Sequence, residues 1–149
     1  MKIPKQSATV QEIVDFYLHS KAFLRLSGRS QLDYEVNLRD ACNTQVYGKR
    51  LGDYRNKTLK VVHLTDAYET WLDTGVATAN RRKAVLSAAW KHAMRHDVMI
   101  HNPISLVKAE SSQPRRVTWE RDHIKRFLDV AYSDFRWRSI GLLVHMSYD

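Results

Sequence analysis

The sequence predicts an all-α protein, because helical periodicity, helix caps and short polar breaks recur along the whole chain. Apolar residues recur at three- and four-residue spacing in each long segment. No segment has the alternation or the density of β-branched residues that is typical of strands. We therefore expect an antiparallel four-helix unit of about 100 residues, followed by a linker and the beginning of a second helical unit.

The first helix is expected after a short polar tail at residues 1–8. Thr9 and Glu12 form a capping box, in which each side chain satisfies a backbone N–H group at the start of a helix. Apolar residues then recur at helical spacing to about Phe23. This pattern predicts one helix, which opens a domain that spans residues 9–103.

A second helix is expected to lead into a basic loop. Residues 27–30 supply a turn and an N-cap for a helix that extends to about Val46 and is stopped by Gly48. The loop that follows, residues 47–60, holds one acid, Asp53, and five cations, namely Lys49, Arg50, Arg55, Lys57 and Lys60. We predict a second phosphate-contacting surface here, and a solvated basic loop is the alternative that the sequence leaves open.

The third and fourth helices complete the first unit. Thr65 is the predicted cap of the third helix, which Gly75 ends. Thr78 is the predicted cap of the fourth helix, which runs without Gly or Pro to about His96 or Asp97. The chain is organised around this fourth helix, because its two faces differ in kind.

One face of the fourth helix is apolar and the opposite face is basic. The apolar face is formed by Val85, Leu86, Ala89 and Ala93, with Trp90 at its edge. The basic face is formed by Asn80, Lys83, Ser87, Lys91 and Arg95. The small side chains of Ala84 and Ala88 lie beside the basic residues and would let the helix backbone approach a large polyanion. Taken alone, this face is more typical of an ordinary solvated helix surface.

Composition favours a nucleic-acid partner. The 149 residues have a formal net charge of +8, and the sequence pI is about 9.7. No apolar run approaches the roughly 18 to 20 residues of a membrane span, and the N-terminus lacks an apolar signal segment. The single Cys42 cannot form an internal disulfide. We expect a protein of the reducing cytoplasm, without membrane association.

No metal, cofactor or active site is predicted. His92, His96 and His101 invite a metal-site interpretation, but the zincin pattern needs Glu directly after the first His, where Ala93 stands. These histidines are expected on the helix surface or facing phosphate. Cys42 lacks the signature of a nucleophile and is expected to be a packed thiol.

The last part of the chain is expected to form a linker at residues 104–117 and an incomplete unit at residues 118–149. Thr118 is the predicted cap of a helix with an apolar side made of Trp119, Ile124, Phe127, Leu128 and Ala131. Residues 136–148 are predicted as a further helix, apolar nearly all round through Ile140, Leu142, Leu143, Val144 and Met146. Two helices cannot bury a sizeable core, so we expect this apolar surface to drive self-association.

The order of these features resembles phage-type tyrosine recombinases (integrases). The resemblance is carried by L-D-Y at 32–34, H-L-T-D-A-Y at 63–68, T-A-N-R-R at 78–82, A-A-W-K-H-A-M-R-H-D-V-M-I-H-N-P at 88–103 and T-W-E-R at 118–121. It implies that residues 9–103 are the core-binding, SAM-like domain. It also implies that residues 118–149 are the truncated start of the catalytic domain.

The resemblance further implies a mode of action for the parent protein. In this family the two domains clamp double-stranded DNA, and a Tyr attacks the scissile phosphate to form a 3′-phosphotyrosine. The first catalytic Arg lies in a T-G-x-R motif after the helix that corresponds to residues 138–148, and the sequence reaches Asp149 without it. The later Lys, H-x-x-R and Tyr of the family are not identified either, and Tyr148 is not expected to be a nucleophile. The chain itself is therefore not expected to be an enzyme.

The sequence thus predicts a DNA-binding fragment of an integrase that acts in the cytoplasm of a bacterial host. The predicted DNA-binding residues are Asn80, Arg81, Lys83, Ser87, Lys91, Arg95, Lys49, Arg50, Arg55 and Lys57. Asn80, Arg81 and Ser87 are the members expected to reach base edges. The alternative is a helical protein-interaction domain with an incidental basic face. Salt dependence of binding separates the two, because phosphate contacts make affinity fall steeply with salt.

Overall fold

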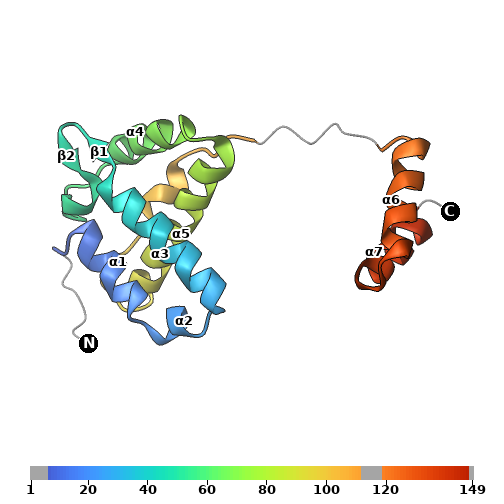
Figure 1. Ribbon diagram of the computed structural model, residues 1–149. Helices are drawn as coiled ribbons and strands as arrows, with labels where there is room; N and C mark the ends of the chain where they lie inside the picture. The colour runs from blue at the N-terminus through green and yellow to red at the C-terminus, as the bar shows by residue number, and fades with distance from the viewer. Residues whose placement is uncertain (1–6, 112–118, 148–149) are drawn as a thin grey trace. The chain divides into compact units, whose positions relative to one another are not determined.

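The computed structural model describes residues 7–111 and 119–147 (Figure 1). The chain divides into two compact units, Met1–Ser112 and Gln113–Asp149. Helices account for most of the described residues, and a short two-stranded hairpin is the sheet that the structure describes. The predicted all-α class is confirmed. Within the described ranges, no helix combines the length and the apolar character that crossing a membrane requires.

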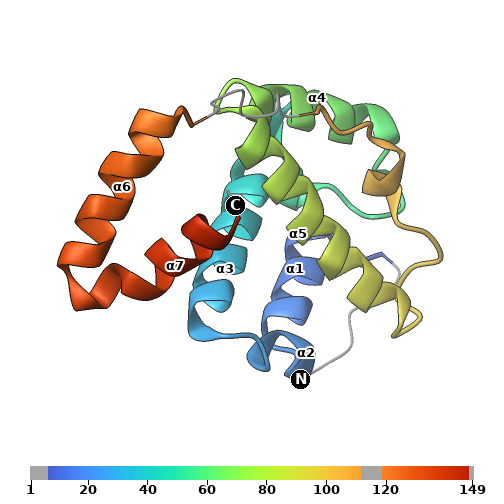
Figure 2. The ribbon, with the colours of Figure 1, turned by 90° about the vertical axis from the view of Figure 1, so that its right-hand side faces the viewer.

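The first unit is built around one long helix, α5. Its elements are α1 (Val10–Leu18), α2 (Lys21–Leu24), α3 (Gly28–Asn43), β1 (Gln45–Val46), β2 (Lys49–Arg50), η1 (Leu51–Asp53), α4 (Val61–Leu72), α5 (Val76–Met94) and η2 (Pro103–Leu106). Helices α1, α3 and α4 all pack against α5 (Figure 2). The largest fully buried side chains include Trp71, Trp90, Leu38, Leu64 and Leu86.

The first helix begins as predicted but ends earlier. The capping box is confirmed, because Thr9 N donates to Glu12 Oε2 at 2.7 Å and Glu12 N donates to Thr9 Oγ1 at 3.2 Å. The prediction of one helix to Phe23 is wrong, since α1 ends at Leu18. Ser20 starts the separate helix α2, where its hydroxyl accepts a hydrogen bond from Phe23 N at 3.1 Å. An N-cap inside the apolar pattern therefore divides it into two helices.

A β-hairpin follows α3, where the sequence predicted more helix and then a loop. Strands β1 and β2 pair antiparallel, with Gln45 opposite Arg50. Tyr47 and Gly48 between them have φ angles of 48° and 74°. Positive φ at two successive residues is the requirement of the tight hairpin turn whose twist matches that of its strands. Gly48 thus allows a hairpin turn, and α3 ends before it, at Asn43.

Two predicted caps lie inside helices. Helix α4 begins at Val61, and Thr65 donates its hydroxyl to the Val61 carbonyl oxygen at 3.1 Å within the helix. Helix α5 has Gly75 as its N-cap, with a φ of 115°, so Thr78 belongs to the helix itself. The predicted end is close to the observed one, because Asp97 takes a left-handed φ of 56° after the last turn.

The apolar face predicted for the fourth helix is confirmed. Val85, Leu86, Ala89, Trp90 and Ala93 are each at most 1% exposed. Trp90, predicted at the edge of this face, is as deeply buried as the other members. The face packs against the other helices of the first unit, and its burial fixes which side of α5 remains open to solvent.

The first unit includes residues on both sides of the expected domain boundaries. Ala8, placed by the sequence in the polar tail, is buried, and its carbonyl oxygen accepts from Asn56 N at 2.9 Å. Ile104 and Val107, placed in the linker, are 0% and 4% exposed and join the core. The unit accordingly continues past Pro103 to Ser112.

The second unit consists of α6 (Arg121–Ser133), η3 (Phe135–Trp137) and α7 (Arg138–Met146). The helices α6 and α7 approach closely at Gly141, where an added Cβ would lie 3.0 Å from the Ala131 Cβ. Ile124 and Ala131 are its buried apolar side chains. Thr118, Tyr148 and the linker residues 112–117 lie outside the described residues.

Candidate nucleic-acid interface

The two helices at the centre of the first unit have opposite charge. Helix α5 and its C-cap contain five cations and no acid: Arg81, Arg82, Lys83, Lys91 and Arg95. Helix α4, which packs against α5, contains Asp66 and Glu69 and no Lys or Arg. A polyanion would therefore be attracted to the side of the unit where α5 is open and repelled from the open side of α4.

The open side of α5 lies between α3 and the segment that contains η2 (Figure 2). Lys91 and Arg95 are exposed there, and neither forms an ion pair with any described residue. Ala84 is exposed and Ala88 is half-buried between the charged side chains. Small residues flanked by free cations permit close approach of a phosphate backbone.

Two arginines of α5 pair with acids of α3. Arg81 forms an ion pair with Asp33, and its guanidinium carbon lies 4.9 Å from the centre of the Tyr34 ring. Arg82 Nη2 lies 3.0 Å from Asp40 Oδ2. The Arg81 side chain stays 43% exposed, whereas that of Arg82 is only 15% exposed. Arg81 is thus held in place and still accessible, while Arg82 mainly joins α5 to α3.

Like Arg81, the other two residues predicted to reach base edges have partners inside the protein. Asn80 Oδ1 accepts from the Tyr68 hydroxyl at 2.6 Å, and Asn80 Nδ2 donates to the Glu110 carbonyl oxygen at 2.8 Å. Ser87 Oγ accepts from Asn102 Nδ2 at 2.8 Å. One amide hydrogen of Asn80 and the hydroxyl hydrogen of Ser87 remain for other partners. Their contact with bases stays a prediction.

Lys83 lies on the same side of α5 as Asn80 and Ser87. A hollow of about 210 Å³ lies between this stretch of the helix and the η2 region, where Ile104 and Ser105 of η2 and Ala109 after it form the other wall. Lys83 is half-buried by this arrangement. Lys83 is therefore a residue of the hollow and not of a flat, fully exposed helix surface.

The predicted loop cations lie elsewhere in the first unit. Lys49 Nζ is 5.0 Å from the centre of the Tyr54 ring. The Tyr47 and Tyr54 rings are 5.7 and 4.6 Å from that of His63, which ties the hairpin to the start of α4 (Figure 1). Arg50 and Arg55 are exposed next to this aromatic cluster in sequence. Lys49 and Arg50 thus belong to the hairpin, whereas Arg55 forms a β-bridge with Thr9 ahead of α1.

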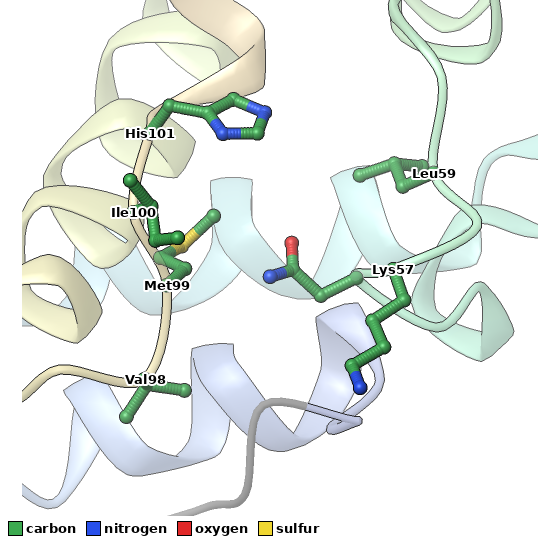
Figure 3. A pocket seen from close by; sticks show the side chains of 7 residues that line it. Lys57, Leu59, Val98, Met99, Ile100 and His101 are labelled. Carbon is green, nitrogen blue, oxygen red and sulfur yellow. The ribbon is translucent and has the colours of Figure 1, made fainter.

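Lys57 lies at a separate hollow of about 270 Å³ (Figure 3). Lys57 and Leu59 form one wall, and the segment after α5, including Ile100 and His101, forms the other. Val98 and Met99 of that segment are buried, so the wall is part of the core. Apart from Lys57 and His101 the lining provides little charge, and we assign no binding role to the hollow.

His92 is buried, which corrects its expected surface position. Its ring centre lies 5.0 Å from that of Phe16, 5.6 Å from that of Tyr17 and 4.7 Å from that of His96. Burial, together with the nearby His96 and Arg95, lowers the pKa of His92 below its ordinary value. The imidazole therefore packs as a neutral ring against α1 and does not face a phosphate.

The pattern H-x-x-R occurs twice in the sequence, at residues 92–95 and 123–126. The prediction that no H-x-x-R is present is therefore wrong as a statement about the sequence. In the first instance the pattern does not bring the two groups together at a site. His92 packs into the core against α1, whereas Arg95 is exposed. His123 and Arg126 are both exposed on α6.

Cys42 is a packed thiol, as predicted. It is 0% exposed, and burial raises its pKa to about 12. A thiol of this kind is almost entirely protonated at neutral pH and is a poor nucleophile or metal ligand. Among residues 7–111 and 119–147, no three His, Cys, Asp or Glu side chains come together as a metal site would require.

Helix α3 also contributes to this surface, which the sequence did not predict. Arg29, Ser30 and Asp33 of α3 line a hollow of about 300 Å³ together with Arg81 of α5. Arg29, Asp33 and Asn37 recur at four-residue spacing, which places them on one face of the helix. That polar stripe was visible in the sequence, but its position beside α5 was not.

Comparison with known proteins gives a structural relationship. No family model and no curated protein matches the sequence. The chain superposes on a lambda integrase tetramer bound to a Holliday junction with a TM-score of 0.65 and 17% identity, over 87% of this chain and 37% of that one. It superposes on the Tn1549 transposon integrase in complex with transposon right end DNA with a TM-score of 0.61 and 20% identity, over 88% and 41% of the two chains. The chain shares its fold with these integrases. It spans less than half the length of either.

Proposed function

We propose that this chain is the DNA-binding part of a tyrosine recombinase of the phage integrase type. The observation that carries the proposal is the charge of α5, which has five cations and no acid beside an α4 that has acids and no cation. The integrase fold, found in proteins whose structures contain DNA, supports the same conclusion. The open side of α5, together with α3, would hold double-stranded DNA.

The mode of binding follows from the accessibility of each group. Lys91 and Arg95 are exposed and unpaired among the described residues, so each can neutralise a phosphate without breaking an internal ion pair. Lys83, which lines its hollow and is half-buried, would add a third cation. Phosphate contacts of this type position the duplex and are largely independent of its sequence. The loop cations Lys49 and Arg50 would serve a second phosphate contact.

The parent activity would be DNA integration by site-specific recombination. In this proposal the first unit is the core-binding domain and α6 with α7 begins the catalytic domain, so that DNA is clamped between the two. The 149 residues contain no T-G-x-R sequence. The chain by itself would accordingly bind DNA without cleaving it, and covalent attachment to a supercoiled or suicide substrate is not expected.

Binding to a labelled duplex of about 25 base pairs, measured by fluorescence anisotropy between about 50 and 200 mM salt, tests the proposal. Contact with several phosphates predicts that the logarithm of the association constant falls linearly with the logarithm of salt, by about 0.9 for each phosphate neutralised. Absence of binding, or binding that is indifferent to salt, would instead support a helical protein-interaction domain with an incidental basic face.

A further inference from the structure

Two carboxylates of α3, Asp33 and Asp40, pair with arginines of α5, and Asp33 is the one that lines a hollow between the two helices. Asp33 lines the hollow of about 300 Å³ with Arg29, Ser30 and Arg81, and its side chain is 40% exposed. A carboxylate at this place repels phosphate, so it weakens sequence-independent binding of DNA. Its position calls for a partner that donates hydrogen bonds.

The Asp33 carboxylate is held in one orientation. Arg81 Nε donates to Oδ2 at 2.7 Å, and the Arg81 Nη2 group bonds the same oxygen. Asn37 Nδ2 donates to Oδ1 at 3.1 Å, and Arg81 in turn stacks on Tyr34. A carboxylate has about four acceptor positions, and these bonds occupy three of them. One acceptor position on Oδ1 remains for a ligand.

The residue one turn earlier on the same face supplies the complementary chemistry. Arg29 is four residues before Asp33 on α3, is exposed and lines the same hollow. In the DNA major groove, arginine pairs with the O6 and N7 acceptors of guanine, and a carboxylate accepts from the N4 amino group of cytosine. Arg29 and Asp33 together therefore match the two edges of a G·C pair.

We propose that Asp33 is a specificity-determining residue that accepts a hydrogen bond from the N4 amino group of a cytosine, with Arg29 facing guanine. The inference rests on the proposed function, because it requires the α3 and α5 surface to meet DNA. Arg81 acts as a positioning residue, since it fixes the carboxylate and offsets its charge. The preorganised geometry lets Asp33 discriminate between bases without first ordering a mobile side chain.

The test is selection of bound duplexes from a randomised pool, followed by binding measurements on the selected sequence and its single-base variants. Wild-type chain should prefer cytosine at one position by roughly 5- to 150-fold over the other bases. Asp33→Ala should lose that preference, and sequences without the cytosine should bind more tightly because a negative charge has been removed. Asp33→Asn should move the preference towards adenine, because an amide pairs with the N6 and N7 groups of adenine.

Asp40→Ala is the matched control. Asp40 also lies on α3 and pairs with an arginine of α5, Arg82, so its removal makes the same change in charge. It should raise affinity for all sequences and keep the cytosine preference. Three results would overturn the inference and leave the proposed function intact. The first is an equal base preference in Asp33→Ala and wild type, and the second is a preference for a base other than cytosine that depends on Asp33. The third is DNA binding without any base preference. Failure of the wild-type chain to bind any duplex would instead overturn the proposed function.

Discussion

The Tyr68 hydroxyl donates a hydrogen bond of 2.6 Å to the side-chain oxygen of Asn80, and this bond joins α4 to α5. Glu110 closes the arrangement, because its N–H donates to the Tyr68 oxygen and its carbonyl accepts from the Asn80 amide, both at 2.8 Å. The three residues fasten the last part of the first unit to its two central helices. Asn80 therefore has a structural role in addition to the DNA contact predicted for it.

Tyr68→Phe should loosen this fastening. Loss of the hydroxyl leaves Asn80 Oδ1 and Glu110 N without their shared partner, and the free energy of unfolding should fall by about 1 kcal/mol in urea denaturation. Amide hydrogen exchange at Glu110 should become faster. Thr70→Ala is the control, because the Thr70 hydroxyl donates to the Asp66 carbonyl oxygen within its own helix. Unchanged exchange at Glu110 in Tyr68→Phe would contradict the assigned role.

The double change Lys91→Ala and Arg95→Ala should lower the magnitude of the salt slope by roughly 1 to 2, since each phosphate contact contributes about 0.9. Fluorescence anisotropy at several salt concentrations measures it. Lys21→Ala with Arg25→Ala removes the same charge from exposed positions in α2 and at its C-cap, and should leave the slope nearly unchanged. If both double variants behave like wild type, α5 is not the interface.

Stability should depend on pH through His92. Burial lowers the pKa of His92 in the folded state, so the unfolded state takes up a proton first as pH falls. The neutral ring makes its full contribution to the free energy of unfolding above the ordinary histidine pKa of about 6.5, and this contribution is lost progressively as the pH falls below that value. Urea denaturation at pH 7.5 and 5.5 should show lower stability at the acidic pH. The loss of stability between the two pH values should be smaller in His92→Gln. It should be the same as in wild type in the exposed control His101→Gln. An equal loss of stability in all three proteins would rule out His92 as its source.

The Cys42 thiol should resist modification in the folded protein. Burial raises its pKa to about 12, so at pH 8 almost no thiolate forms, and the side chain is inaccessible as well. A colorimetric thiol reagent should react slowly with the native chain and rapidly after addition of denaturant. Rapid reaction of the native chain would show that α3 opens at this position.

Self-association through α7 remains a prediction. Leu142, Leu143 and Met146 are 54%, 66% and 78% exposed, and Phe135 of η3 is 82% exposed. Analytical ultracentrifugation should show dimers or larger species for the full chain and monomers for a version that ends at Pro114. Leu143→Ser with Met146→Ser in the full chain should also favour the monomer. Monomeric behaviour of the unaltered chain at high concentration would refute the prediction.

Local sequence patterns determined the helical class, the capping box at Thr9 and the apolar face of α5. These features depend on residues within one or two turns of each other, so a periodicity or a cap signal contains the necessary information. The basic composition of α5 was equally evident from sequence. The hairpin turn at Tyr47 and Gly48 was missed, because Gly is consistent with both a helix stop and a tight turn.

Only the tertiary structure decided which polar groups are free. Arg81 and Asp33 are 48 residues apart in sequence, and Asn80 is 30 residues from Glu110, so no local pattern indicates their pairing. His92 has the spacing of a surface residue but is buried, because α1 packs against that edge of α5. The sequence by itself determined that α5 has a basic side. Packing of α3 and of the segment after η2 against that side determined which of its cations can reach a partner, because burial and ion pairing depend on neighbours brought together from distant parts of the chain.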